Sequence, residues 1–205
     1  RNLLRKRVWV MKTRLPRQEF ADALNAAATL TGGRTTKPIL SCVKLATEDG
    51  ALRISSTDGE ASLRLAVPAF SIERPGECVV SAARLLDIVR ELADAELLLD
   101  ADDRHCSVKA QGSEFKIFTL PAADFPPIPE FEDGPDQVID GNLLRLMIAI
   151  TIYAAARETS RYAINGVLWE KQGKKLFIVA TDGRRLARAG GPIREVSSAD
   201  FQVIV

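Results

Sequence analysis

The sequence predicts an α+β fold built from repeated β-α-β-β-β half-units. The main observation is an internal repeat, in which residues 34–59 align without a gap on residues 158–183. Each copy holds an apolar strand, a turn, a second strand and a closing Thr-Asp-Gly, at Thr57-Asp58-Gly59 and Thr181-Asp182-Gly183. A repeat of this length indicates duplicated structural units. It argues against a single catalytic centre, because an enzyme rarely needs the same module twice, whereas a scaffold around a repetitive ligand does.

Composition and charge are those of an ordinary globular protein. The 205 residues are 46% hydrophobic and 27% charged, with a net charge of +1. Cys42, Cys78 and Cys106 form no CxxC motif and no Cys/His cluster. This favours reduced thiols in the cytoplasm over disulfides or a zinc site, so we expect no metal and no cofactor. No apolar run approaches the roughly 20 residues that span a bilayer.

Basic residues gather in residues 1–10, and the rest of the chain is slightly acidic. We interpret residues 1–10 as a basic extension ahead of Met11. A basic DNA-binding arm is the alternative.

The first half-unit is expected to contain a strand at residues 11–15 and a helix at residues 17–30. Phe20, Leu24 and Ala27 recur at helical spacing in that helix. Strands follow at residues 39–47, 52–56 and 61–67, and Glu48-Asp49-Gly50 is a strong hairpin signal.

The second half-unit has the same order. We expect a strand at residues 77–80, a helix at residues 82–92 capped by Ser81, and strands at residues 96–99, 106–110 and 115–120.

A proline-rich stretch divides the chain. Residues 124–136 hold four prolines and read as a linker between a first domain at residues 11–123 and an incomplete second domain at residues 137–205. The second domain is expected to contain a helix at residues 142–156, strands at residues 164–170 and 176–180, and a last apolar strand near the C-terminus.

Four segments together resemble the bacterial β sliding clamp, the processivity subunit of DNA polymerase III. They are TLPAADFP at residues 119–126, SRYAINGVL at residues 160–168, Gly32-Gly33-Arg34 with Pro38-Ile39-Leu40, and VATDGRRLA at residues 179–187, which is similar to the family's VATDGHRLA turn. The resemblance implies a DNA-clamp fold with helices on the inner face and sheets outside. It covers the family's first domain and about half of its second.

The resemblance also implies a function without catalysis. A sliding clamp encircles duplex DNA without sequence preference and tethers the replicative polymerase. Its implied partners are double-stranded DNA, the polymerase catalytic subunit, the clamp loader and repair proteins. Family clamps close as homodimer rings, in which residues 114–120 would be an edge strand. We do not expect this shorter chain to close such a ring alone.

Two sets of site residues follow from the resemblance. Contacts to the DNA backbone are implied for Arg34, Arg157 and Tyr162, where positive charge would neutralise phosphate without reading sequence. One wall of a pocket for short partner peptides is implied for a second set: Arg161, Ile164, Thr181, Gly183, Arg184, Arg185 and Leu186. Aliphatic side chains would bury the peptide, and arginines would bind its carbonyls or carboxylates.

Other interpretations remain open at this point. Arg34 could be an ordinary solvated arginine, Tyr162 a core residue, and the second set a well-packed hairpin. Asp58 and Asp182 could form a hydrolytic pair, but an Asp-Gly turn explains both. His105 has no partner at recognisable spacing and is expected on a strand surface. The main functional alternative is a truncated clamp-like adaptor that binds partner peptides without encircling DNA.

Overall fold

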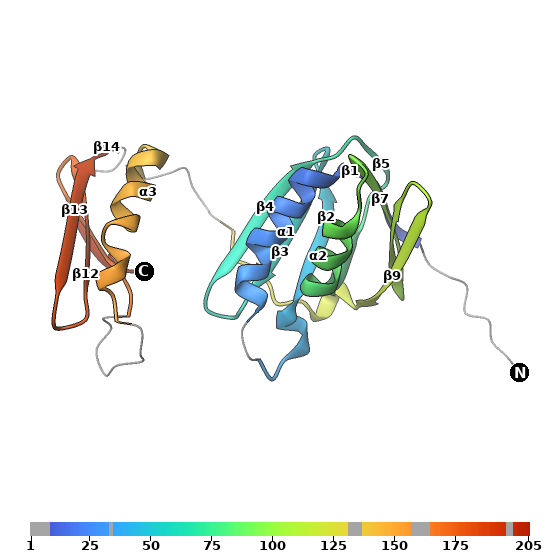
Figure 1. Cartoon of the computed structure of the whole chain (residues 1–205), viewed down its shortest axis with the longest axis horizontal. Coiled ribbons are helices and arrows are strands. Elements are labelled where there is room, and N and C mark those ends of the chain that lie inside the picture. Colours follow the sequence, from blue (N-terminus) through green and yellow to red (C-terminus); the bar gives the residue numbers. More distant parts are fainter. Residues whose placement is uncertain (1–8, 33–34, 131–136, 157–164, 196–198) are drawn as a thin grey trace, which may run out of the picture. The chain divides into compact units, whose positions relative to one another are not determined.

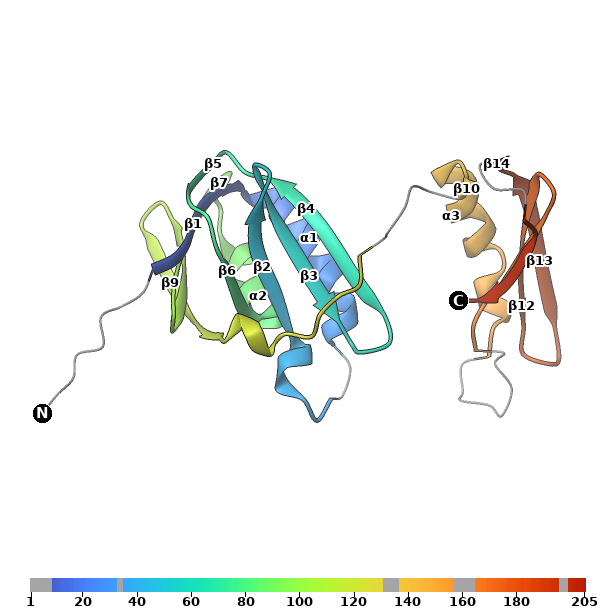
Figure 2. The same ribbon diagram turned by 180° about the vertical axis from the view of Figure 1, so that it is seen from behind.

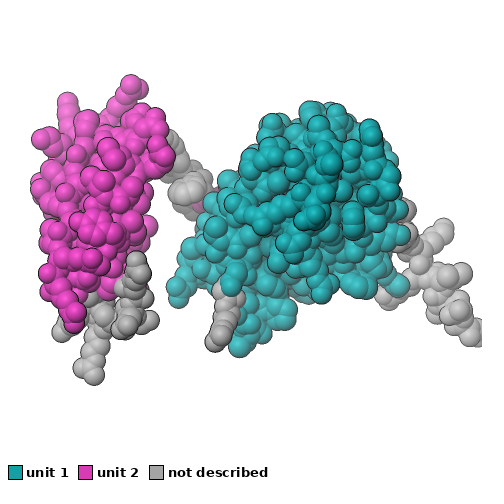
Figure 3. All heavy atoms as spheres, viewed as in Figure 1, with its two compact units in different colours: residues 1–129 teal, residues 130–205 magenta. Residues whose placement is uncertain are grey.

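A computed structural model describes residues 9–32, 35–130, 137–156, 165–195 and 199–205. The chain divides into two compact units, residues 1–129 and residues 130–205 (Figure 3). Each unit has a core of its own. No helix within the described ranges is both long enough and apolar enough to cross a membrane.

Unit 1 contains two consecutive β-α-β-β-β half-units, as the sequence predicts. The first comprises β1 (Trp9–Pro16), α1 (Arg17–Thr31), β2 (Cys42–Glu48), β3 (Ala51–Thr57) and β4 (Ser62–Pro68). The second comprises β6 (Glu77–Ser81), α2 (Ala82–Glu91), β7 (Glu96–Asp102), β8 (His105–Ala110) and β9 (Ser113–Leu120). A short strand, β5 (Ser71–Arg74), links the two.

The two half-units exchange their first strands. The sheet order is β4-β3-β2-β6-β9-β8-β7-β1-β5, so that β6 completes the first half-unit's strands and β1 completes the second's. β1 pairs antiparallel with β7, and β6 pairs antiparallel with β2. Neither half-unit therefore forms its sheet alone.

The helices α1 and α2 lie side by side against the sheet (Figures 1 and 2). Their buried faces carry Phe20 and Leu24 on α1 and Leu85 and Val89 on α2, which join strand residues in one core. Arg90 on α2 donates to Asn25 on α1, with 2.6 Å between the guanidinium nitrogen and the amide oxygen. The amphipathic spacing read from the sequence thus places both helices correctly.

Several details of unit 1 differ from the sequence-based expectation. The strand expected from residue 39 begins only at Cys42, because Pro38 starts a 3-10 turn, η1 (Pro38–Ser41). Ser81 occupies the position before α2, but its side chain makes no capping hydrogen bond. The strand β5 was not anticipated from sequence, since its place depends on pairing with β1.

The expected edge strand is only partly an edge. Thr119 and Leu120 pair with β6, so the C-terminal end of β9 lies inside the sheet. Over Ser113–Phe118 the described residues pair with β8 alone. A second 3-10 turn, η2 (Ala122–Asp124), follows at the start of the proline-rich stretch.

Unit 2 repeats the half-unit once more. Its elements are β10 (Gln137–Val138), α3 (Gly141–Ala149), η3 (Ile152–Ala154), β11 (Leu168–Gln172), β12 (Lys175–Thr181), β13 (Leu186–Pro192), β14 (Arg194–Glu195) and β15 (Phe201–Ile204). The main sheet has the order β13-β12-β11-β15, and β10 pairs with β14. Asp140 caps α3 by accepting from the Leu143 N–H at 2.9 Å.

The helix expected over residues 142–156 is shorter than predicted. Thr151 ends it: the buried hydroxyl donates to the Met147 carbonyl at 2.7 Å, and the Thr151 N–H bonds to Ile148 three residues back. This tightens the chain into η3 and turns the following residues away from the helix axis. β11 also begins at Leu168, later than the expected residue 164, which lies outside the described residues.

One buried lysine fixes the last strand of unit 2. Lys171 is 1% exposed, and its ammonium donates to the Ala199 carbonyl at 2.8 Å. The Asp200 carboxylate accepts from the Gly173 N–H at 2.9 Å. Together these bonds hold the start of β15 against the β11–β12 turn.

We expect Gly76→Ala to destabilise unit 1 severely. A Cβ at residue 76 would lie 1.7 Å from the Val10 carbonyl oxygen, and Gly76 is also held by two hydrogen bonds with the Thr47 hydroxyl. Backbone would have to move, which should cost about 2 kcal/mol or more of unfolding free energy. Urea unfolding followed by circular dichroism measures it.

The matched control is Gly32→Ala at the end of α1. There the nearest atom would lie at an ordinary 3.6 Å and the backbone is right-handed. We expect a change within about 0.5 kcal/mol. Equal effects of the two substitutions would contradict the close approach at Val10.

Candidate functional site

The structure describes five residues of the expected peptide wall. Thr181 ends β12, Leu186 starts β13, and the turn between them carries Gly183, Arg184 and Arg185. The other expected site residues lie outside the described part of the chain: Arg34, Arg157, Arg161, Tyr162 and Ile164.

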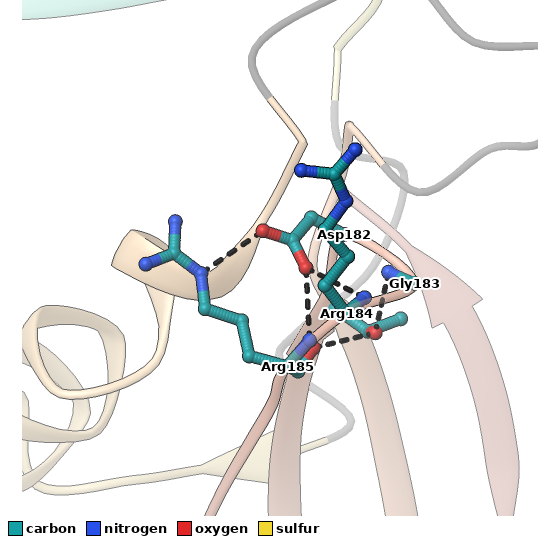
Figure 4. A network of polar contacts seen from close by, with 5 residues as sticks. Asp182, Gly183, Arg184 and Arg185 are labelled. Carbon is teal, nitrogen blue, oxygen red and sulfur yellow. Dashed lines mark hydrogen bonds and ion pairs between the residues drawn. The ribbon is translucent and has the colours of Figure 1, made fainter.

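Asp182 organises this turn through its carboxylate (Figure 4). Its Oδ1 accepts from the N–H groups of Arg184 and Arg185, each at 3.0 Å. The Thr181 hydroxyl donates to the Arg185 carbonyl at 2.7 Å and accepts from the Gly183 N–H at 3.1 Å. Gly183 has φ 84°, a left-handed conformation that favours glycine. Four hydrogen bonds thus close the turn from its own side chains.

The same turn occurs in unit 1 between β3 and β4. Asp58 Oδ1 accepts from the N–H groups of Glu60 and Ala61, at 2.9 and 2.7 Å. The Thr57 hydroxyl donates to the Ala61 carbonyl at 2.8 Å and accepts from the Gly59 N–H at 3.1 Å. The two turns therefore share these four hydrogen bonds position by position. Unit 1 adds one more, in which the Ser62 hydroxyl donates to the Thr57 Oγ1 at 3.0 Å.

The side chains displayed on the two turns are different. Unit 1 carries Glu60, Ala61 and Ser62, whereas unit 2 carries Arg184, Arg185 and Leu186 at the equivalent positions. Because the unit 1 turn forms with an acid, an alanine and a serine, the arginines and the leucine are not needed to build it. Formation of the turn therefore does not explain why unit 2 has these three side chains.

Arg185 is held in one orientation. Its Nε donates to Asp182 Oδ2 at 2.9 Å, and its guanidinium carbon lies 5.6 Å from the centre of the Tyr153 ring. Tyr153 belongs to η3 and is 56% exposed. Sequence reasoning missed this tyrosine because it fell within the helix expected over residues 142–156.

Leu186 and Tyr153 give the site exposed apolar surface. Leu186 is 65% exposed although it begins a strand whose next residue, Ala187, is buried. Apolar groups with this exposure beside charged residues mark a surface that can bury a partner's side chain. The arrangement is therefore a short wall of aliphatic, aromatic and guanidinium groups.

Hydrogen bonding lowers the pKa of both turn aspartates. For Asp182 the N–H groups of Arg184 and Arg185 have the largest effect, followed by the charge and hydrogen bond of the Arg185 side chain. For Asp58 the N–H groups of Ala61 and Glu60 lower the pKa. Both carboxylates are thus committed to their turns, which supports the structural interpretation of Asp58 and Asp182 over acid–base chemistry.

His105 has a local role at the start of β8. Its Nδ1 lies 3.8 Å from the buried Asp102 carboxylate, and its ring centre lies 4.9 Å from that of Phe118. The side chain is half-buried rather than fully exposed on the strand surface.

Comparison with protein families assigns both units. Residues 11–129 match the family of the DNA polymerase III beta subunit, N-terminal domain. Residues 138–205 match the family of the DNA polymerase III beta subunit, central domain.

Individual relatives agree with this assignment. The chain is 33% identical to the beta sliding clamp of Escherichia coli K12 over 196 residues, covering 95% of this chain and 53% of that protein. It is 36% identical to the beta sliding clamp of Pseudomonas aeruginosa, covering 93% of this chain and 52% of that one. The chain therefore spans about half the length of the curated relatives that it matches.

Solved structures match equally well. The crystal structure of the P. aeruginosa DNA polymerase III subunit beta superposes with a TM-score of 0.85 at 35% identity, covering 95% of this chain and 53% of that one. A P. aeruginosa sliding clamp bound to griselimycin gives a TM-score of 0.85 at 34% identity, with coverage of 96% and 53%.

We expect Asp182→Ala to loosen its turn without unfolding unit 2. Loss of the carboxylate removes the bonds to the Arg184 and Arg185 N–H groups, so their amide exchange should speed up by roughly three- to tenfold. Hydrogen exchange followed by NMR measures this. Asp58→Ala is the matched control and should affect the Glu60 and Ala61 amides instead.

The contribution of Asp182 should depend on pH in one direction. Because the folded-state pKa lies below the usual 3.8, the stabilisation is fully present above that value and is lost as pH falls through the lower folded pKa. Wild type and Asp182→Ala should therefore converge in acid. A difference that persists or grows at low pH would contradict this account of the turn.

Proposed function

Because the chain belongs to the DNA polymerase III beta subunit family of sliding clamps, we propose that it acts in DNA replication as a processivity factor. It would encircle duplex DNA with further clamp domains, as a homodimer ring in its complete form, and tether the polymerase. The role needs no catalytic group, since it depends on topology and on weak contacts. Its place would be the cytoplasm, where bacterial DNA lies.

The observation that carries this proposal is the match of two successive clamp domains to the two units, in order and without rearrangement. The repeated half-unit supports it physically. A ring around a helical polymer presents equivalent surfaces several times, and duplicated β-α-β-β-β modules supply them. Within the described part of the chain, the three half-units contribute one α-helix each, of 15, 10 and 9 residues.

The exposed charges of α1 and α2 include more acids than arginines. Arg84 and Arg90 are exposed on α2 beside Asp87 and Glu91, and α1 adds the exposed Glu19 and Asp22, so this face has no basic patch and only its two arginines could attract phosphate. Weak, sequence-independent attraction to phosphate is what a mobile ring requires. Arg34, Arg157 and Tyr162 are proposed as further backbone contacts.

The turn at residues 181–186 is proposed as one wall of a partner-binding pocket, with Arg161 and Ile164 completing it. Support comes from the exposed Leu186 and Tyr153 and from the ordered Arg185 beside them. Griselimycin binds a P. aeruginosa clamp of the same fold. The partners proposed are the polymerase catalytic subunit, the clamp loader and repair proteins, through short linear segments.

Retention on circular DNA tests the clamp proposal. The chain joined to further clamp domains of the family would be loaded on nicked circular plasmid and separated by gel filtration, and the plasmid would then be cut once. The chain alone, which we do not expect to close a ring, would be treated in the same way. A clamp stays with the circle and is lost from the linear molecule, because only topology holds it. Mass measurement by light scattering gives the number of subunits. Peptide binding without any retention would support the truncated adaptor instead.

We expect Arg34→Ala to weaken binding to duplex DNA equally for all sequences. Removing one phosphate contact should also reduce the slope of log affinity against log salt by about one. Fluorescence anisotropy across a salt series measures both. Arg104→Ala, an exposed arginine on the β7–β8 turn, is the matched control and should leave the slope unchanged. Identical slopes for wild type and Arg34→Ala would contradict the contact.

We expect Leu186→Ala to weaken griselimycin binding by roughly tenfold, because the ligand would cover an apolar side chain that is exposed in the free protein. Isothermal titration calorimetry measures the change. Ile204→Ala is the control: Ile204 is 51% exposed in the same unit but lies on β15. Equal losses for the two variants would remove Leu186 from the proposed pocket.

A further inference from the structure

The two Thr-Asp-Gly turns form a comparison within one molecule. The four hydrogen bonds that their aspartate and threonine side chains make with the backbone are the same, yet the residue after the glycine is Glu60 in unit 1 and Arg184 in unit 2. The conformation of the turn therefore does not explain the charge at this position. The charge at this position is negative in unit 1 and positive in unit 2, which is the unit that carries the exposed Leu186 and Tyr153.

The two neighbouring arginines are not equivalent. The guanidinium of Arg185 is already engaged by Asp182 and lies over the Tyr153 ring. Figure 4 shows the Arg184 side chain leaving the turn in a different direction from that of Arg185. Within the described part of the chain, the Arg184 guanidinium makes no hydrogen bond or ion pair.

Within residues 181–192, no free acid balances the charge of Arg184. Asp182 is the only acidic residue between Thr181 and Pro192, and its Oδ2 is bound to Arg185. β13 adds Arg188, which lies over the Phe177 ring, and carries no acid. An arginine without a partner presents a planar fork of donors that suits a carboxylate.

We propose that Arg184 binds a carboxylate of the partner peptide, next to an apolar side chain that covers Leu186 and Tyr153. This inference rests on the proposed function, and it assigns the two arginines separate roles. Arg185 is a positioning residue that orders the wall, and Arg184 selects for acidic partners. The carboxylate can come from an Asp or Glu side chain or from the C-terminus of the partner.

A peptide explains the site better than a DNA phosphate does. Phosphate would satisfy the charge of Arg184 but would leave Leu186, 65% exposed, and Tyr153, 56% exposed, uncovered. A segment with an apolar side chain beside an acid covers both groups at once, which is the complementarity that short linear segments use.

Substitution of Arg184 should leave the fold intact. The turn uses only the backbone N–H of this residue, and the unit 1 turn tolerates a glutamate in the same place. Arg184→Gln removes the charge and keeps a polar side chain of similar reach. Arg184→His installs the residue of the family turn that the sequence resembles. Lys175→Gln removes one positive charge at the opposite end of the same hairpin and is the matched control.

The experiment measures binding of fluorescent eight-residue peptides that share a Leu-Phe pair. One set carries Asp or Asn beside that pair, with the C-terminus amidated. A second set has no acidic side chain and ends in a free carboxylate or an amide after Leu-Phe. Affinities by anisotropy at about 50 and 500 mM NaCl separate the charge-dependent part, since salt screens exposed charges. A competing duplex DNA shows whether phosphate occupies the same site.

We expect wild type to prefer the carboxylate form of at least one set by about three- to tenfold at low salt, with a smaller preference at high salt. Arg184→Gln should abolish the preference, Arg184→His should reduce it, and Lys175→Gln should keep it. Which set shows it identifies the source of the carboxylate.

Several results would overturn the proposal. One is equal binding of acid and neutral peptides, and another is a preference that survives Arg184→Gln or is lost in Lys175→Gln. In these cases the peptide wall stands and only the role of Arg184 is wrong. Displacement of acidic peptides by DNA through Arg184 would assign the residue to phosphate instead. If no peptide and no griselimycin bind, the pocket itself is wrong, and the proposal fails with it.

Discussion

The exchange of first strands between half-units is the constraint on which unit 1 depends. Because β6 completes the strands of the first half-unit and β1 those of the second, neither can cover its apolar residues alone. The core is consequently shared, and α1 and α2 lie together on one face. The duplication seen in the sequence is thus also a structural requirement, because each half-unit needs a strand from the other. The close contact of Gly76 with Val10, and its bonds to Thr47, lie where the two half-units join.

In the Thr-Asp-Gly turns, the residues that form the turn differ from the residues whose side chains can bind a partner. Each turn is closed by its own aspartate, threonine and glycine. The side chains of the two residues after the glycine are therefore not needed to form the turn. Unit 1 fills those positions with Glu60 and Ala61, and unit 2 fills them with Arg184 and Arg185. A hairpin fixed by short-range bonds is a rigid support, which is what a binding surface needs to avoid ordering costs. The same module can therefore serve as plain connection in one unit and as a display of side chains in the other.

The sequence predicts the repeated half-units, the helices α1 and α2 and the turn residues, because each has a local signal: a 3.6-residue apolar period or an Asp-Gly pair. It misplaces features that depend on competing hydrogen bonds. Pro38 converts an expected strand start into η1, and the Thr151 hydroxyl ends α3 early. Because the helix was expected to include residue 153, the sequence did not identify Tyr153 as a site residue. In the structure, η3 places its ring under the guanidinium of Arg185. The strand β5 and the pairing of Thr119 and Leu120 depend on distant partners, so no local pattern indicates them. Ser81 has the sequence of a cap without its hydrogen bond, and the structure offers no physical reason.

Comparison of the two turns also shows what effect the ion pair between Asp182 and Arg185 has. Asp58 has no arginine beside it, yet its pKa is lowered by backbone N–H groups alone. Backbone N–H groups are likewise the largest cause for Asp182. Arg185 is therefore not required to keep Asp182 ionised, and the interaction works mainly in the other direction: a carboxylate already fixed by the backbone orients a long, flexible side chain. An exposed ion pair adds little stability by itself. Its effect here is to hold one guanidinium over Tyr153, which leaves the charge of Arg184 as the one that this turn presents to a partner.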